Sequence, residues 1–168
     1  WNNCIRKYYI QSGYVAALYK GDAVVSGGSA DSDGIPDIER VTGSGNIRGV
    51  IVDFEYDMSD LSKVYSPAST EGYAYVVDDP YVIFEVQEDS DSSNLSADEV
   101  GTNTDLTTTA GSSTTGLSGM ELDSDGTGTG SAHCRILGLV QRSDNAIGTN
   151  AKWLVLINEH ELNSTTGV

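Results

Sequence analysis

Short apolar runs that alternate with polar residues constrain the fold of this chain more than any other feature. The clearest case is residues 73–88, YAYVVDDPYVIFEVQE, in which Val82, Phe84 and Val86 fall on one face at a period of two. Residues 78–80, Asp-Asp-Pro, divide the run, because proline cannot continue a strand ladder and favours a turn. A period of two belongs to β-strands, so this region predicts two strands joined by a turn.

A second run, IRGVIVDFEY at residues 47–56, alternates in the same way. Asp53 and Glu55 point away from the apolar positions, which predicts a half-buried strand with an acidic outer face. The residues predicted to share its buried face are Val50, Val52, Phe54 and Tyr56.

The rest of the chain extends the same pattern. Ser96 followed by Glu99 is the one helix-start signal and predicts a single turn. Ser26 to Pro36 reads as a polar loop. Further strands are predicted at residues 4–10, 14–19, 23–25, 37–41, 134–140 and 152–157. The sum predicts an all-β fold, a barrel or sandwich of about eight or nine short antiparallel strands with long Gly/Ser/Thr-rich loops and almost no helix.

The length suits a single β domain over residues 1–168. Residues 1–9 are a candidate N-terminal arm. Residues 101–131, rich in Thr, Ser, Gly and Asp, have the composition of a linker, but their apolar side chains favour an extended loop that crosses a surface. Cys4 and Cys134 are the only cysteines, and the sequence leaves open whether they form a disulfide or two free thiols.

The charge balance excludes some partners. Nine Lys and Arg face 25 Asp and Glu, for a net charge of −16. Phosphate binding requires clustered basic side chains, so we expect neither direct nucleic-acid binding nor attachment to a negatively charged membrane.

Asp31, Asp33 and Asp37 form the sharpest local motif, in the run DSDGIPDIE. Closely spaced carboxylates around a glycine are how proteins gather oxygen ligands on Ca²⁺, so these three residues are candidate ligands. The alternative interpretation is a solvated acidic turn. Residues 123–126, Asp-Ser-Asp-Gly, are a weaker copy. Apart from calcium at this motif, the sequence predicts no cofactor.

Catalytic signals are weak. His133 and His160 are the only histidines, and neither lies in a nucleophile motif. His133 precedes Cys134, and neighbours in a strand point to opposite faces, which is poor geometry for a Cys–His pair. The sequence therefore predicts no enzymatic activity.

The order of the sequence blocks carries a resemblance. SGYVAALYKGDAVV is followed by IRGVIVDFEY, YAYVVDDPYVIFEVQED, GSSTTGLSGMELDS and RILGLVQRSDNAIGTNAKWLVLINEHEL. From about Tyr9 to Leu162 this order resembles virion structural proteins of tailed bacteriophages, of the capsid decoration or cement type. The resemblance implies an all-β protein on the outer face of the phage head, in contact with the major capsid protein and often a homotrimer. It supplies no catalytic residues.

These lines together predict a decoration protein that stabilises the capsid lattice, located in the virion. Trp1, Tyr8, Tyr9, Leu117 and Met120 are the predicted apolar interface anchors, although each is also suited to an intramolecular core. Two alternatives stay open. One is another phage component, such as a head fibre, collar or tail protein. The other is a secreted Ca²⁺-dependent carbohydrate-binding or adhesion module.

Overall fold

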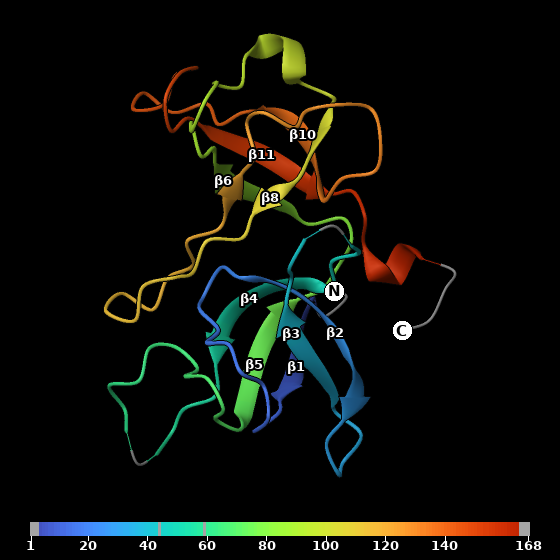
Figure 1. Cartoon of the computed structure of the whole chain (residues 1–168), viewed down its shortest axis with the longest axis vertical. Helices are drawn as coiled ribbons and strands as arrows, with labels where there is room; N and C mark the ends of the chain where they lie inside the picture. Colours follow the sequence, from blue (N-terminus) through green and yellow to red (C-terminus); the bar gives the residue numbers. More distant parts are fainter. Residues whose placement is uncertain (1–3, 44, 59, 165–168) are drawn as a thin grey trace.

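The computed structural model describes residues 4–43, 45–58 and 60–164, and these form two stacked β units (Figure 1). We call residues 4–78 the barrel unit and residues 79–164 the sheet unit. The barrel unit contains β1 (Ile5–Ile10), β2 (Ala23–Ala30), β3 (Pro36–Arg40), β4 (Gly49–Phe54) and β5 (Gly72–Val77). The sheet unit contains β6 (Ile83–Gln87), β7 (Asn103–Thr104), β8 (Leu106–Thr107), β9 (Glu121–Leu122), β10 (Cys134–Leu139) and β11 (Lys152–Ile157).

The barrel unit is a closed barrel with the strand order β1-β3-β2-β4-β5. Strand β1 closes it, because it pairs in parallel with β3 at Tyr9–Asp37 and antiparallel with β5 along its whole length. Closure leaves no strand edge open. The interior is filled by Tyr8, Ile10, Leu18, Val24, Ile38, Ile51, Ala74 and Val76.

The sheet unit is built on an open four-stranded sheet with the order β6-β11-β10-β7. Strands β8 and β9 form a separate two-stranded ribbon beside it. Trp153 on β11 is fully buried at the centre of the apolar side of the sheet. The core residues around it are Leu95, Leu122, Cys134, Ile136, Ala151 and Val155.

A shared apolar cluster joins the two units. Ala23, Val41 and Ile47 of the barrel unit pack with Ile157 of the sheet unit, and Phe84, Leu106, Met120, Val25 and Val50 pack against this cluster. The segment after β11, which includes the 3₁₀ turn Glu161–Asn163, runs along the barrel unit. There the Glu161 carboxylate accepts hydrogen bonds from the Ser26 amide (2.8 Å) and the Ser26 hydroxyl (2.6 Å).

The all-β prediction is confirmed. The described residues contain eleven strands, more than expected, because three of them (β7, β8 and β9) are only two residues long and lie within the predicted loop 101–131. The helical content of the described part is two 3₁₀ turns. One of these has the predicted capping box, in which the Glu99 carboxylate accepts from the Ser96 amide at 2.7 Å. None of the helices in the described ranges is long and apolar enough to span a membrane.

Three local predictions are wrong. In β4 the residue inside the barrel is Ile51, while Val52 and Tyr56 are exposed. A register shift between Ile51 and Asp53 interrupts the alternation, so Phe54 still packs against the barrel core. Residues 14–19 do not form a strand, and β2 continues to Ala30, through half of the predicted polar loop.

Candidate functional site

The most distinctive feature of the surface is an apolar groove at the junction of the two units, with a volume of about 250 Å³. We call it the β6 groove, because the open edge of β6 forms one wall. The segment Leu117–Met120 forms the opposite wall. The apolar residues that line it are Ala23, Ile47, Val50, Phe84, Val86, Leu106, Leu117, Met120, Val155 and Ile157.

The two walls meet at one end of the groove. There the Asp89 amide donates to the Leu122 carbonyl at 3.0 Å, and the Gln87 side chain donates to Glu121 at 2.9 Å. Further along, the second wall turns to the barrel unit, where the Ser118 amide donates to the Lys20 carbonyl at 2.8 Å. Because the second wall pairs with the barrel unit, it does not pair with β6, and the groove opens between them.

Buried polar contacts hold the second wall against the barrel unit. Asp22 is fully buried and accepts hydrogen bonds from the Ser118 hydroxyl (2.5 Å) and the Tyr19 amide (2.9 Å). Burial raises the pKa of Asp22, while the Ser118 and Tyr19 hydrogen bonds oppose that rise. Gly116 has a φ of +72° and lies so close to the barrel unit that a Cβ would come within 2.4 Å of the Val64 carbonyl oxygen. Only glycine fits this turn, so the wall is tightly seated.

Ion pairs lie at the rim of the groove. Lys20 contacts Asp53 at 2.7 Å, and Arg142 contacts Glu85 at 2.8 Å. The Lys20 hydrogen bond holds the pKa of Asp53 below its ordinary value. These pairs leave the groove an apolar floor with a charged, hydrated margin.

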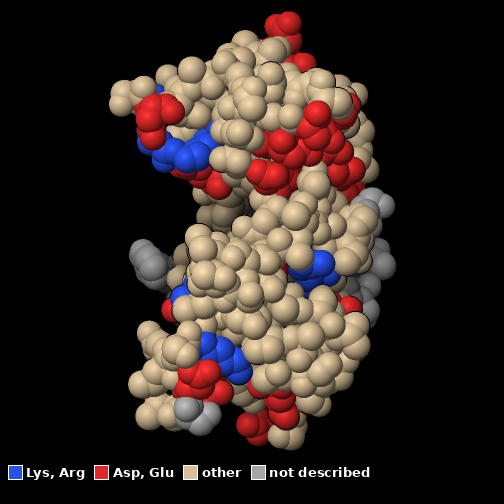
Figure 2. All heavy atoms as spheres, turned by 60° about the vertical axis from the view of Figure 1, so that its left-hand side comes forward, with Lys and Arg blue, Asp and Glu red and all other residues tan. Residues whose placement is uncertain are grey.

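The charge of the chain is concentrated in the sheet unit. Residues 79–168 contain 14 Asp and Glu and three Lys and Arg, against 11 and six in residues 1–78. Figure 2 shows a dense group of Asp and Glu side chains over the sheet unit, while the barrel unit shows smaller groups of both signs on this face. The unit that carries the open strand edge is therefore the strongly acidic one.

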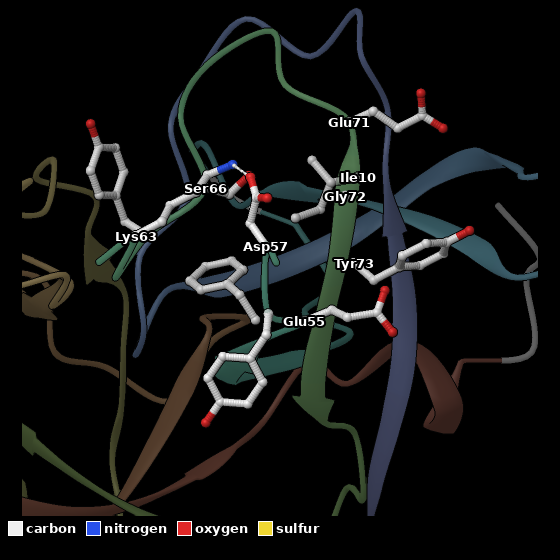
Figure 3. Close-up of a pocket in the computed structure, with 11 residues that line it drawn as sticks. Ile10, Glu55, Asp57, Lys63, Ser66, Glu71, Gly72 and Tyr73 are labelled. Carbon is white, nitrogen blue, oxygen red and sulfur yellow. Dashed lines mark ion pairs between the residues drawn. The ribbon is translucent and has the colours of Figure 1, made fainter. Parts of the chain in front are cut away.

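A second cleft, of about 300 Å³, lies on the barrel unit (Figure 3). Asp57 and Lys63 point toward one another across it and form an ion pair at 3.5 Å. Glu71, at its edge, accepts a hydrogen bond from the Tyr9 hydroxyl at 3.1 Å. Next to this polar cleft, the loop that follows β4 exposes large apolar side chains, namely Tyr56, Met58 and Leu61, with Met58 86% exposed.

The predicted calcium ligands do not converge. Asp31 accepts hydrogen bonds from the amides of Asp33 (2.9 Å) and Ile35 (2.8 Å), which stabilise a local turn. Asp37 is buried and accepts from the Ser29 amide at 2.7 Å and from the Gln11 side chain. The described part of the chain contains no group of three or more His, Cys, Asp or Glu placed to hold a metal. The calcium prediction is corrected to the acidic-turn interpretation.

The weaker copy at residues 123–126 is also a turn. The Asp123 carboxylate accepts from the amides of Asp125 (2.8 Å) and Gly126 (3.2 Å). Asp125 in turn accepts from Ser93 at 2.7 Å, so its carboxylate stabilises the neighbouring loop.

The predicted interface residues divide into three groups. Trp1 lies outside the described residues. Tyr8 was assigned to the interface wrongly: it is 1% exposed, and its hydroxyl donates to buried Asp78 at 2.7 Å and accepts from Arg48 at 2.6 Å. Burial and the Asp78 hydrogen bond raise the pKa of Tyr8 to about 12.

The other three predicted anchors are at least partly accessible. Tyr9 is half-buried on the outer side of β1, where its ring packs against Tyr73. Leu117 and Met120 lie together in the second wall of the β6 groove, and Leu117 is 55% exposed. The apolar anchors in the Thr/Gly-rich region therefore identified one wall of the groove. Its other wall, the open edge of β6, was missed, because strand order cannot be read from alternation.

Cysteine and histidine side chains form no reactive arrangement in the described part of the chain. Cys4 and Cys134 are both free thiols, which resolves the alternative in favour of no disulfide. Burial raises the pKa of the Cys134 thiol to about 12, so it stays protonated and unreactive. His133 is buried, and its Nδ1 accepts from the Leu106 amide at 3.1 Å, as a structural contact would.

Comparison with protein-family models, with curated proteins and with solved structures gave no match.

Proposed function

We propose that this chain is a capsid decoration protein, which binds the outer surface of a tailed-phage head and stabilises the lattice of the major capsid protein. Two lines support the proposal. The first is the block order of the sequence, which resembles virion structural proteins of that type. The second is the nature of the candidate site, an apolar groove suited to binding another protein.

The strongest support for the proposal is that the β6 groove lies against the closed barrel, which provides a rigid base. A groove lined by Phe84, Met120 and Leu117 offers apolar surface to a partner, and exposed apolar surface rimmed by charges is typical of protein-binding sites. The closed barrel behind it limits the entropy lost on docking. In a homotrimer, three linked contacts with the symmetric shell would raise the affinity above that of one site.

The acidic surface fits the same role. A net charge of −16 opposes non-specific aggregation of the free protein, which keeps it available for attachment to the shell. Subunits that bind only the assembled shell stabilise it by mass action. A homotrimeric state and the major capsid protein as partner are parts of this proposal.

The test is to locate and count the chain in purified particles of the source phage. We expect quantitative mass spectrometry to give a copy number comparable to that of the major capsid protein, and antibody labelling to mark the head. Labelling of the collar or tail would instead support another phage component, and absence from the particles would reject a virion role altogether.

A further inference from the structure

The open edge of β6 points its backbone groups into the β6 groove. The Glu88 amide donates to the Ala151 carbonyl next to β11, at 3.0 Å, while the next amide, Asp89, donates to Leu122 on the opposite side. Backbone directions alternate along a strand, so the N–H and C=O groups of Ile83, Glu85 and Gln87 point the same way as those of Asp89. In the described ranges β9 reaches this side only at the end of β6, through a parallel bridge between Glu88 and Leu122, and the edge is open along the rest of the strand.

The groove has room for side chains as well as backbone. A strand laid along β6 would place every second side chain level with Phe84 and Val86, over the apolar floor. The side chains between them would lie level with Ile83, Glu85 and Gln87, on the outer face of the sheet. An alternating segment, aliphatic on one side and polar on the other, therefore fits both surfaces.

Charge selects among such segments. The sheet unit has 14 acidic and three basic side chains, and Asp89 and Glu121 stand at the closed end of the groove. A segment that carries Lys or Arg at its polar positions is attracted to this surface, while a second copy of this chain, itself strongly acidic, is repelled.

We infer that the β6 groove binds an extended segment of a partner protein by strand addition, with aliphatic side chains on the floor and basic side chains at the rim. Backbone hydrogen bonds to Ile83, Glu85 and the Gln87 amide provide affinity that does not depend on sequence, and the floor provides specificity. As a mode of capsid attachment, this inference rests on the proposed function. Strand addition itself does not, and it can be tested separately.

The test compares two substitutions at one position. Glu85→Pro removes an N–H that points into the groove and leaves the bonds to β11 in place, as is tolerated in edge strands. Glu85→Ala is the matched control, because it also loses the Arg142 ion pair but keeps the N–H. Two probes are used, a short synthetic peptide of alternating Val and Lys, and capsid shells of the source phage that lack this chain.

We expect the wild-type chain and Glu85→Ala to bind the Val/Lys peptide with similar affinity, and Glu85→Pro to bind it about tenfold more weakly. A peptide of alternating Val and Glu should bind more weakly than the Val/Lys peptide to all three proteins. The amides of Glu85 and Gln87 in the wild-type chain should exchange more slowly with solvent when the Val/Lys peptide is present. This last measurement decides the question even if Glu85→Pro does not fold.

The outcomes separate the two proposals. Equal peptide binding by both variants, or unchanged exchange at Glu85 and Gln87, overturns strand addition. Shells that bind Glu85→Pro as tightly as Glu85→Ala reject this mode of attachment and leave the decoration function standing. Shells that do not bind the wild-type chain reject the decoration function, and the peptide result then decides strand addition alone.

Discussion

The barrel unit and the sheet unit use the same kind of strand for different purposes. In the barrel unit, β1 pairs with both β3 and β5, so every strand has two neighbours. In the sheet unit, β6 and β7 end the four-stranded sheet. A closed sheet satisfies its own backbone, whereas an open edge keeps hydrogen-bonding groups available. The difference suggests that one unit supplies rigidity and the other recognition.

Asp78 in the barrel unit and Glu88 in the sheet unit are both buried carboxylates, and they have different roles. The barrel unit buries Asp78 with a hydrogen bond from Tyr8 and an ion pair to Arg6 at 3.0 Å. The sheet unit buries Glu88, whose carboxylate accepts from the Leu95 amide at 2.8 Å and from the Trp153 indole at 3.3 Å. The first network ties strands of the barrel together, and the second positions the end of β6 where the groove begins. Four substitutions test this division, in order of expected effect.

The largest effect is expected in the sheet unit. Trp153→Ala removes a fully buried side chain from the centre of its core and should lower the free energy of unfolding by about 3–5 kcal/mol. Urea unfolding followed by circular dichroism measures the change. Leu137→Ala, at a partly exposed position on the outer face, is the control and should cost much less. Similar values for both would show that the sheet unit lacks the core described above.

The junction between the units comes next. Glu161→Ala removes the acceptor of two Ser26 hydrogen bonds and a 3.7 Å contact with Arg48, and should cost about 1–3 kcal/mol. If the chain is the predicted single domain, the wild type unfolds in one transition. Glu161→Ala weakens the junction, so we expect its barrel unit and sheet unit to unfold less cooperatively. Glu159→Ala is the control, because Glu159 contributes its backbone carbonyl to the junction. Two well-separated transitions in the wild-type chain would contradict a single domain.

In the barrel unit, Tyr8→Phe keeps the buried ring and removes the hydroxyl. Asp78 then loses a donor, and the expected cost is about 1–2 kcal/mol in the same urea assay. Tyr9→Phe removes an exposed hydrogen bond to Glu71 and should have little effect. A Tyr8→Phe variant as stable as the wild type would show that the Asp78 network contributes little to the barrel.

The smallest effect is a dependence on pH at the junction. Burial lowers the pKa of His160 below 6.5, with the Arg48 charge acting in the same direction, so the folded chain holds the neutral form. The imidazole of His160 takes up a proton near pH 6.5 in the unfolded chain, but only at a lower pH in the folded chain. The stability that depends on neutral His160 is therefore complete above about pH 6.5, and it is lost as the pH falls through the pKa of the folded chain. Melting temperatures of the wild type and His160→Asn between pH 7.5 and about 5 should converge as the pH falls. A constant difference would contradict the assignment.

The sequence was most informative where aromatic and aliphatic residues are dense. Most of the predicted strand 81–88 forms β6, and residues 152–157 form β11, with Phe84 and Val86 on the inner face as predicted. The Ser96–Glu99 capping box was also predictable, because its signal is entirely local. Alternation failed in β4, where a bulge shifted the register after Ile51.

The candidate site was only half predictable. Leu117 and Met120 were identified because apolar side chains stand out in a Thr/Gly-rich stretch. The open edge of β6 depends on which strands become neighbours, and the parallel β1–β3 contact shows how poorly chain order reveals this. The aspartates at positions 31, 33 and 37 predicted a metal site that the structure does not form. Closely spaced carboxylates also accept backbone hydrogen bonds in turns, as Asp31 does here.

The most direct test of the account is electron cryo-microscopy of capsid shells to which the wild-type chain has been added. We predict the chain on the outer face of the shell, with an extended segment of capsid protein beside Ile83–Gln87, in the groove between the barrel unit and the sheet unit. A chain attached through the exposed loop around Met58, with nothing beside β6, would contradict it.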